Sequence, residues 1–463
     1  MMTSQYKQEL GLKESIAIII GKIIGSGIFK TPAPIMLLSG SVFVFFQTWI
    51  VGGILTFLSA MLYAEMVSAF PKSGGPYEYL KRAYHPLVPF LRGWAMFFVS
   101  ETAAIVVVSI VFSEYTIKIL QYYFFVEATF LLEMFLTIAL IWFFTFFNTI
   151  GLEFSGWFQD VLSFLKMLSL FYIIIVCFSQ PKSYESKMYF PESFEFASWI
   201  SGMAISLRYA LFTYSGWEGA TYVAEEVKNP SKNLPLSLFL GIFIVMTIYL
   251  LTNVGYLMQL SPEEIANSKF VAAEAMEKAL GPIGATTISF IIALNTAGNV
   301  NAQIFTKSRT WQAMSRDGLF FSFLAPLSSN SLPVRSLIFQ AMWATVLTLL
   351  AYSSYFLKTT VSIYDRLIDF FSFTSSVFNI LTIVAVWILR KKYPDVPRHF
   401  RIPDRLFYVV FFIVLAIYFL YAFYTLVSAF FESLMGIILT LSGLLYWKYK
   451  IKPKLEKYNL SEL

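Results

Sequence analysis

The residues best suited to hold a small ligand lie in two glycine-containing interruptions of apolar stretches. The first is Gly25-Ser26-Gly27, and the second is Ser215-Gly216-Trp217-Glu218-Gly219. Glycine in the middle of a helix costs about 1 kcal/mol relative to alanine and permits backbone angles that other residues resist. We therefore expect both helices to be unwound here. Close packing of helices through small residues is the alternative explanation for either stretch taken alone.

An unwound helix offers free backbone groups of both polarities. Where the helix resumes after the first interruption, the amides of Ser26, Gly27 and Ile28 and the positive end of the helix dipole suit a carboxylate. Where the helix stops at the second interruption, its last carbonyl groups suit an ammonium group. These acceptors are the carbonyl oxygens of Phe212, Thr213 and Ser215. Together the two ends predict a clamp for an α-amino acid.

Ionisable side chains lie in the same kind of apolar stretch. Lys22 and Glu218 flank the two interruptions, and Lys166 lies well inside another apolar run. Such a group is costly inside a membrane and usually faces a cavity or a partner. Three roles are open for Lys22 and Glu218. They could neutralise each other, they could bind a charged side chain of the ligand, or Glu218 could carry a proton. Of these three roles we favour the ion pair.

Polar residues at helical spacing mark one further apolar run. Asn295, Asn299 and Gln303 recur every four residues and share one helical face. Such a stripe either lines a pathway or forms hydrogen bonds with neighbouring helices. Arg208 and Glu101 also lie in apolar stretches, but their spacing does not favour a pair between them.

The composition requires that these residues be positioned by helices in lipid. The 463 residues are 57% hydrophobic and 13% charged, whereas about a quarter of the residues in a soluble domain are charged. A hydrocarbon core about 30 Å thick is crossed by about 20 apolar residues in a helix. The twelve runs that satisfy this length are Ser15–Leu38, Ser41–Ala69, Val88–Leu120, Ala128–Phe147, Trp157–Phe178, Ala197–Ala224, Leu234–Leu257, Gly281–Ile304, Ser336–Phe356, Ile363–Leu389, Leu406–Ser428 and Leu434–Trp447.

Lysine and arginine set the expected orientation of these spans. Both are concentrated in loops on the side of the N-terminus, above all in residues 390–405 and in the tail 448–457. Because basic loops stay in the cytoplasm, both termini are predicted to be cytoplasmic. The first apolar run has no small-residue cleavage site and is expected to be retained as a helix. The net charge of +6 thus reflects topology and does not indicate nucleic-acid binding.

Other classes of function find little support in the residues. Only two histidines, His85 and His399, are present, so neither a metal site nor a histidine-based catalytic dyad is expected. No cofactor is predicted. The single cysteine, Cys177, lies in an apolar run and is expected to be a small buried side chain.

The two interruptions also predict an internal repeat. Each one lies in the helix that opens a group of five predicted spans. Paired broken helices at matching positions are typical of inverted repeats with a ligand site near the middle of the membrane. We therefore expect an all-α membrane protein of two related halves followed by two additional helices.

Four ordered motifs resemble those of the amino acid-polyamine-organocation transporters, most closely their L-type amino acid transporter branch. They are the first-helix signature Gly21–Phe29, the loop Pro71–Tyr77, the sixth helix with its following loop (Phe212–Trp217 and Glu225–Pro230), and Ser308-Arg309 with Asp317-Gly318. The resemblance covers roughly the first three quarters of the chain. The last two helices resemble the family in hydropathy alone.

The resemblance implies a five-plus-five inverted repeat with discontinuous helices 1 and 6, plus two C-terminal helices, in a plasma or bacterial inner membrane. The expected divisions are a cytoplasmic N-terminus 1–14, a first repeat 15–178, a second repeat 197–389, two further helices 406–447 and a basic tail 448–463. It implies amino acid transport by alternating access, as sodium-independent exchange or proton-coupled uptake. Transport of polyamines or other amines by the same fold is the alternative, and no enzyme activity is expected.

The resemblance also assigns roles to particular residues. Lys166 is expected to replace a sodium ion and to bind carbonyl groups near Ile23, although it could instead reach an interface or pair with Asp160. Phe212 is expected to cover the substrate from outside, and Trp217 to contact the substrate or pack against the protein. L-type relatives in animals are linked to a single-span glycoprotein through a cysteine. Because Cys177 falls within a span, no disulfide-linked heavy chain is predicted. The oligomeric state is left open.

Overall fold

The computed structural model describes residues 8–150, 153–182, 196–328, 332–353 and 362–457. These residues form helices joined by short loops, with one isolated β-bridge between Leu10 and Val227. The helices of the first half are α1 Leu12–Ile23, α2 Gly27–Lys30, α3 Pro32–Ser39, α4 Val42–Ala69, α5 Pro76–Ala83, α6 Leu87–Ala95, the π-helix η1 Met96–Ser100, α7 Glu101–Phe124, α8 Phe130–Ile150 and α9 Glu153–Ser179.

The second half is also helical, and its first helix leads to the second interruption. Its elements are α10 Phe196–Thr213, the 3₁₀ helix η2 Trp217–Glu226, α11 Pro230–Gln259, α12 Pro262–Asn267, α13 Val271–Leu280, α14 Pro282–Arg316, the 3₁₀ turn η3 Ser322–Leu324, α15 Val334–Ser353, α16 Ile363–Lys392, α17 Asp404–Ser428, α18 Phe430–Tyr446, the π-helix η4 Trp447–Ile451 and α19 Lys452–Lys457.

Most predicted spans agree with these helices to within a few residues, and the differences have physical causes. The third span carries a π-helical segment, η1, within an otherwise continuous helix from Leu87 to Phe124. The eighth runs on to Arg316 because its polar C-terminal turns pack against η3. The predicted span Ser336–Phe356 extends beyond Ser353 into residues that lie outside the described part of the chain. The predicted N-terminus 1–14 and tail 448–463 also lie partly outside the described residues.

The surface of the bundle is suited to lipid. Within the described residues, nine helices are long and apolar enough to cross a membrane. Large apolar side chains point outward from several of them and are not covered by protein. Examples are Phe135 (65% exposed), Phe143 (61%), Ile175 (65%), Phe243 (58%), Phe412 (61%) and Phe419 (56%). Apolar side chains exposed at this density favour burial in hydrocarbon, so the chain is a multi-pass membrane protein.

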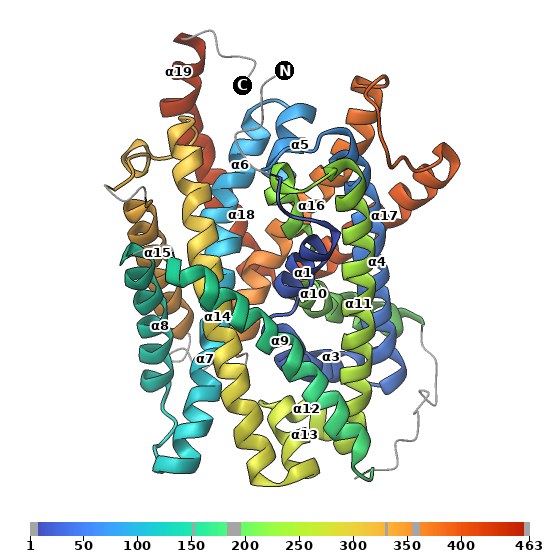
Figure 1. Cartoon of the computed structure of the whole chain (residues 1–463), viewed down its shortest axis with the longest axis vertical. Helices are drawn as coiled ribbons and strands as arrows, with labels where there is room; N and C mark the ends of the chain where they lie inside the picture. The colour runs from blue at the N-terminus through green and yellow to red at the C-terminus, as the bar shows by residue number, and fades with distance from the viewer. Residues whose placement is uncertain (1–7, 151–152, 183–195, 329–331, 354–361, 458–463) are drawn as a thin grey trace.

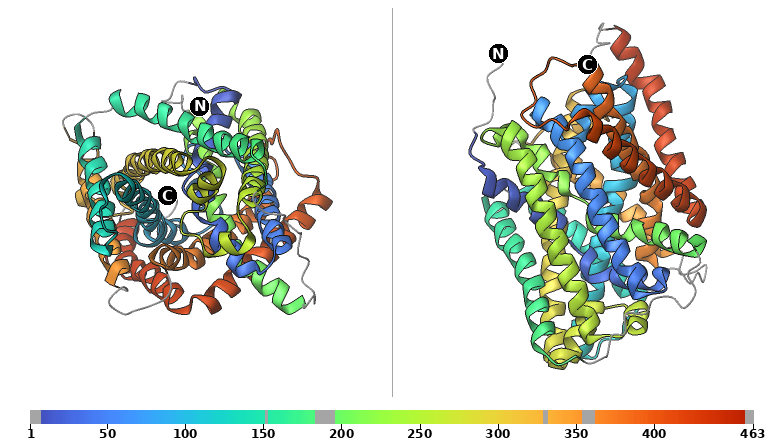
Figure 2. Two further views of the ribbon diagram at one scale, coloured as in Figure 1. Left: turned by 90° about the horizontal axis from the view of Figure 1, so that it is seen from below. Right: turned by 90° about the vertical axis from the view of Figure 1, so that its right-hand side faces the viewer.

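The long helices enclose the short ones at the interruptions. α4 and α11 lie side by side along the bundle, and α7 packs along α14 (Figures 1 and 2). α1 packs against α11 and η2, while α10 packs against α3 and α4. Both interruptions are therefore held in the interior, surrounded by helices on several sides.

Candidate functional site

The first predicted interruption is present in the structure. α1 ends at Ile23, Ile24 is extended (φ −69°, ψ 101°), and α2 begins at Gly27. Thr31, between α2 and α3, keeps helical angles (φ −71°, ψ −18°), so the helix continues almost without a break from Gly27 to Ser39. The first span is therefore two helical segments joined by the three residues Ile24, Gly25 and Ser26.

The second interruption is also present, but the segment after it is not an α-helix. α10 ends at Thr213, and the chain resumes at Trp217 as the 3₁₀ helix η2. Gly216 has a left-handed backbone (φ +93°), and a Cβ atom there would lie 2.8 Å from the Lys22 carbonyl oxygen. Glycine is required at this position for both reasons. The two breaks thus touch each other directly.

A second close approach joins the segments on the other side of the breaks. A Cβ atom on Gly27 would lie 2.6 Å from Oγ1 of Thr213. The Thr213 hydroxyl donates to the Tyr209 carbonyl oxygen at 2.8 Å and lies 2.8 Å from the Thr31 hydroxyl. Gly27 therefore admits the Thr213 side chain into the first break.

Breaking α1 leaves the carbonyl groups of its last residues without helical partners. The Tyr249 hydroxyl, from α11, donates to the Ile23 carbonyl oxygen at 3.0 Å and lies 3.3 Å from that of Thr213. The buried ammonium of Lys166 donates to the Gly21 carbonyl oxygen at 3.4 Å. Lys166 was predicted to bind carbonyl groups near Ile23, and the one that it contacts lies two residues earlier in the chain. The side chain of Asp160, its alternative partner, lies outside the described residues.

The groups predicted to clamp a ligand differ in how free they are. The Ser26 hydroxyl is buried and has no hydrogen-bond partner among the described residues, and Gly27 and Ile28 are buried beside it. The Phe212 carbonyl oxygen, predicted to be free, accepts from both the amide (3.1 Å) and the hydroxyl (2.6 Å) of Ser215. The Ser26 hydroxyl is therefore unpaired among the described residues, whereas two of the predicted acceptors, the Phe212 and Thr213 carbonyl groups, already have partners within the protein.

The favoured ion pair between Lys22 and Glu218 is wrong for this structure. No ion pair within 4.0 Å joins them in the described part of the chain. The Lys22 ammonium instead lies 5.2 Å from the centre of the Tyr222 ring. Lys22 is exposed although α1 is enclosed by helices, and its aliphatic stem runs where a side chain on Gly219 would be. Lys22 is therefore an exposed cation beside the breaks.

The polar stripe on α14 leads from the first break to a second pair of charges. A Cβ atom on Gly25 would lie 2.9 Å from Nδ2 of Asn299, and Gln303 donates to Oδ1 of Asn299 at 2.8 Å. Lys307, one turn further, donates to Gln303 at 2.5 Å and pairs with Glu101 at 2.6 Å. Asn295 instead donates to Ser169 of α9 at 3.1 Å. The stripe thus forms hydrogen bonds along its own face and to neighbouring helices.

Buried ion pairs lie on the opposite side of the breaks. Arg208 of α10 pairs with Asp369 of α16 at 2.8 Å, and not with Glu101. Lys30 of α2 pairs with Glu114 of α7 at 2.5 Å. Lys269, in the loop before α13, lies 3.2 Å from the same Glu114 carboxylate. These contacts hold α2 and α10 against the surrounding helices.

The two predicted aromatic contacts pack against protein side chains. The half-buried Phe212 ring lies 5.8 Å from that of Phe371 and 6.3 Å from that of Tyr364, both on α16. The Trp217 ring lies edge-on to Tyr63 of α4 at 4.7 Å. Phe212 therefore packs toward α16, the helix that carries Asp369, whereas Trp217 packs toward α4.

Sequence reasoning did not single out Tyr249 or the Lys30–Glu114 pair. Lys30 and Glu114 could have been found, because each is an ionisable residue inside a predicted span. Tyr249 gives a weaker signal, since it is one of 27 tyrosines in the chain. Its role is apparent only from its position opposite both breaks.

The fold and these breaks define a multi-pass helical membrane protein in which two interrupted helices meet among polar side chains. Residues 10–447 match the amino acid permease family. The chain belongs to this family, and the match includes the last two helices, for which hydropathy alone had suggested a resemblance.

Three relatives illustrate the similarity. The chain is 32% identical over 462 residues to the large neutral amino acids transporter small subunit 2 of Mus musculus, which covers 96% of this chain and 82% of that protein. It is 30% identical over 460 residues to the Asc-type amino acid transporter 1 of Mus musculus, covering 96% and 83%. It is 29% identical over 452 residues to the b(0,+)-type amino acid transporter 1 of Mus musculus, covering 96% and 88%. The relatives are named as transporters and not as enzymes, in agreement with the prediction that this chain is not an enzyme.

Proposed function

We propose that this protein is a secondary active transporter of amino acids that works by alternating access. The observation that carries the proposal is the contact between two helix breaks beside a buried hydroxyl group, that of Ser26, that has no partner among the described residues. Polar backbone in a membrane is tolerated where it lines a cavity. The names of the relatives point to amino acids as the substrates.

The substrate carboxylate binds at Ser26, Gly27 and Ile28, where the resumed helix offers amides and the Ser26 hydroxyl. The substrate ammonium binds near the Ser215 and Thr213 carbonyl groups. Phe212 covers the site from outside, and Ile23 and Trp217 complete its walls. Lys22 and Glu218 lie at its inner edge, where they act as pocket charges or, for Glu218, as a proton carrier.

Lys166 occupies the place that a coupling cation would need, because its ammonium already binds a carbonyl group of the broken helix. This contact supports sodium-independent transport, either as exchange or as proton-coupled uptake. No metal or cofactor is proposed.

The arrangement of charges supports one conformational state. Lys22 and Ser215 are exposed, and the Lys22 ammonium faces Tyr222 of η2, whose last residue, Glu226, bonds to the segment before α1. Buried ion pairs tie α2 and α10 to their neighbours on the opposite side of the breaks. We infer a state that is open toward the termini and closed at the other end. In the opposite state these ion pairs must separate.

The architecture that we propose has twelve spans in a five-plus-five inverted repeat with two additional helices, in a cell membrane with both termini in the cytoplasm. Cys177, the only cysteine, is buried in α9, and its Cβ atom lies 3.2 Å from where a side chain on Gly255 would begin. A disulfide to a heavy chain is therefore not part of the proposal.

Uptake of labelled amino acids into proteoliposomes tests the function. We expect uptake that needs no sodium and that depends on internal amino acid or on a pH gradient. Neutral, cationic and anionic amino acids are compared with simple diamines, which lack a carboxylate. Equal uptake of a diamine would favour the amine transporter, and absence of saturable uptake of any amino acid would contradict the proposal.

A further inference from the structure

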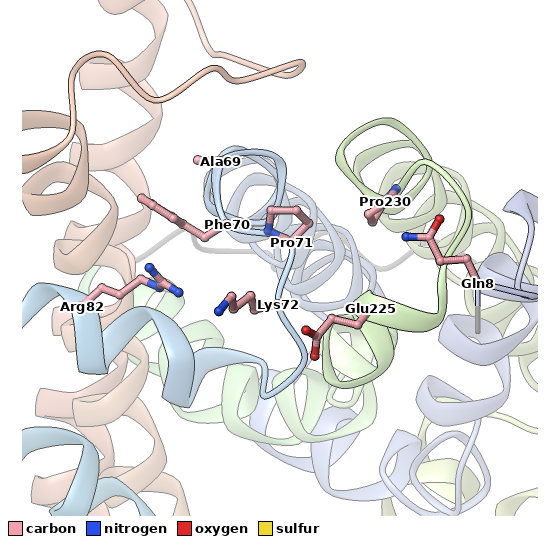
Figure 3. A pocket seen from close by; sticks show the side chains of 8 residues that line it. All are labelled: Gln8, Ala69, Phe70, Pro71, Lys72, Arg82, Glu225 and Pro230. Carbon is pink, nitrogen blue, oxygen red and sulfur yellow. The ribbon is translucent and has the colours of Figure 1, made fainter. Parts of the chain in front are cut away.

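A cavity of about 340 Å³ lies at the end of the bundle from which the chain enters α1, and it shares no residue with the candidate site. It is lined by Gln8, Ala69, Phe70, Pro71, Lys72, Arg82, Glu225 and Pro230 (Figure 3). Its walls come from the segment before α1, the end of α4 and the loop that follows it, α5, the end of η2 and the start of α11. Pockets of this size are large enough for small ligands.

Two cations converge on this cavity. Figure 3 shows the ends of the Lys72 and Arg82 side chains pointing toward each other. Lys72 is exposed and makes no ion pair within 4.0 Å with any described residue. Arg82 stacks its guanidinium on Phe70 at 4.8 Å and binds Glu78 at 2.6 Å through one terminal nitrogen, but its buried Nε has no partner among the described residues. Hydrogen-bond donors left over on two neighbouring cations suit an anion.

The opposite wall offers an acceptor. The Glu225 carboxylate accepts from the Ser73 amide at 3.4 Å, while the Glu225 amide donates to the Ser73 hydroxyl at 3.1 Å. These bonds fix Glu225 against the α4–α5 loop. Its carboxylate suits a ligand group that donates hydrogen bonds. The remaining lining is mostly apolar, from Ala69, Phe70, Pro71 and Pro230.

We propose that this cavity binds a phosphorylated ligand, with its phosphate on Lys72 and Arg82 and a hydroxyl or ammonium group on Glu225. The phosphate could belong to a lipid headgroup or to a soluble phosphate ester, which share this chemistry. A bound ligand bridges the α4–α5 loop and the end of η2. Binding therefore favours the conformation in which the α4–α5 loop and the end of η2 are in contact. Because η2 also carries Glu218, ligand binding should affect transport. The effect on transport rests on the proposed function, whereas the binding itself does not.

Binding is measured as a change in the thermal unfolding midpoint of the full chain in a zwitterionic detergent, titrated with three probes. These are dioctanoyl phosphatidylglycerol, sn-glycerol 3-phosphate and dioctanoyl phosphatidylcholine, whose headgroup has no hydrogen-bond donor. We expect saturable stabilisation by the first or the second probe and none by the third. Stabilisation by phosphatidylglycerol alone identifies a lipid site, and stabilisation by glycerol 3-phosphate at equal concentration identifies a soluble anion.

Variants distinguish this cavity from general charge. Lys72→Glu should weaken the apparent affinity about tenfold or more, because one charge-assisted hydrogen bond is lost. Lys72 is exposed, so this variant should fold; Arg82→Gln should act in the same direction. The control Lys448→Glu removes an exposed lysine at the same end of the molecule and should leave the affinity unchanged. An equal response of parent, Lys72→Glu and Lys448→Glu, or a response to phosphatidylcholine equal to that of phosphatidylglycerol, would overturn the proposal, whatever the result of the transport assay.

Discussion

The Tyr249 hydroxyl donates a hydrogen bond of 3.0 Å to the carbonyl oxygen of Ile23, the last residue of α1. The same oxygen atom of Tyr249 lies 3.3 Å from the carbonyl oxygen of Thr213, the last residue of α10. One side chain of α11 therefore reaches the final carbonyl groups of both broken helices. A carbonyl group that is buried without a partner costs about 1–3 kcal/mol, so this contact stabilises the breaks where they meet.

Tyr249→Phe should lower the stability of the protein by about 1–3 kcal/mol, because the two carbonyl groups lose their shared donor. Transport should fall as well, since the ends of α1 and α10 are no longer held together. The measurements are thermal unfolding in detergent and uptake by proteoliposomes. Tyr408→Phe, which removes a hydroxyl group at the exposed surface, is the control. If both variants behave like the parent, Tyr249 does not stabilise the breaks.

Gly27→Val should abolish substrate binding while the protein is still produced. Even the first added carbon would lie 2.6 Å from Oγ1 and 2.9 Å from Cβ of Thr213, whose branched side chain cannot easily turn away. The milder Gly27→Ala should bind weakly, and Gly27→Ala with Thr213→Ala should regain part of the affinity, because two of the three closest atoms are removed. Binding of a labelled amino acid to purified protein reports the result. Undiminished affinity in folded Gly27→Val would remove the clamp from the proposed site.

Lys166→Ala should slow transport in sodium-free buffer more than it weakens binding. The ammonium of Lys166 binds the Gly21 carbonyl group, and without it the end of α1 keeps an unsatisfied acceptor and can relax. The rate of exchange and the affinity are measured separately. Lys182→Ala, at an exposed lysine, is the matched control. Transport at the parental rate with no added cation would show that Lys166 has no such role.

Arg208 and Asp369 should be strongly coupled in a double-mutant cycle. Removing either partner of this buried pair leaves a charge uncompensated and should cost about 3–5 kcal/mol. Arg208→Met with Asp369→Leu should recover much of that loss in thermal unfolding. If the pair closes one side of the site, as we propose, the double variant should also spend more time open on that side. Simply additive losses would show that the pair contributes nothing beyond its separate residues.

Lys22 and Glu218 should behave differently in the same kind of cycle. They form no ion pair in the described structure, and Lys22 is exposed, so the coupling between Lys22→Thr and Glu218→Asn should stay below about 1 kcal/mol, as for solvent-exposed charges. Unfolding and substrate binding are measured for both single variants and for the double variant. A coupling of about 3 kcal/mol or more would restore the buried pair that the sequence favoured.

Hydropathy and glycine placement were enough to predict the helical membrane class and the interrupted first and sixth spans, and four short motifs carried the family resemblance. Gly216 carries information on its own, because the left-handed backbone that it adopts (φ +93°) is a conformation that glycine allows and other residues resist. Apolar runs likewise predict helices in lipid from their length alone. Boundaries shifted where neighbouring segments pack, as in the extension of α14 to Arg316.

The pairing of charges could not be read in the same way. Lys22 and Glu218 both flank the predicted breaks, yet the Lys22 ammonium faces the Tyr222 ring, while Arg208 and Lys30 find partners on α16 and α7. Tyr249 serves both breaks from a third helix that is distant from one of them in the chain. Local sequence determines where a helix forms and where it breaks, because both depend on the residues themselves. Tertiary packing decides which side chain reaches a freed carbonyl or a buried charge, because that depends on how distant helices meet within a few ångströms.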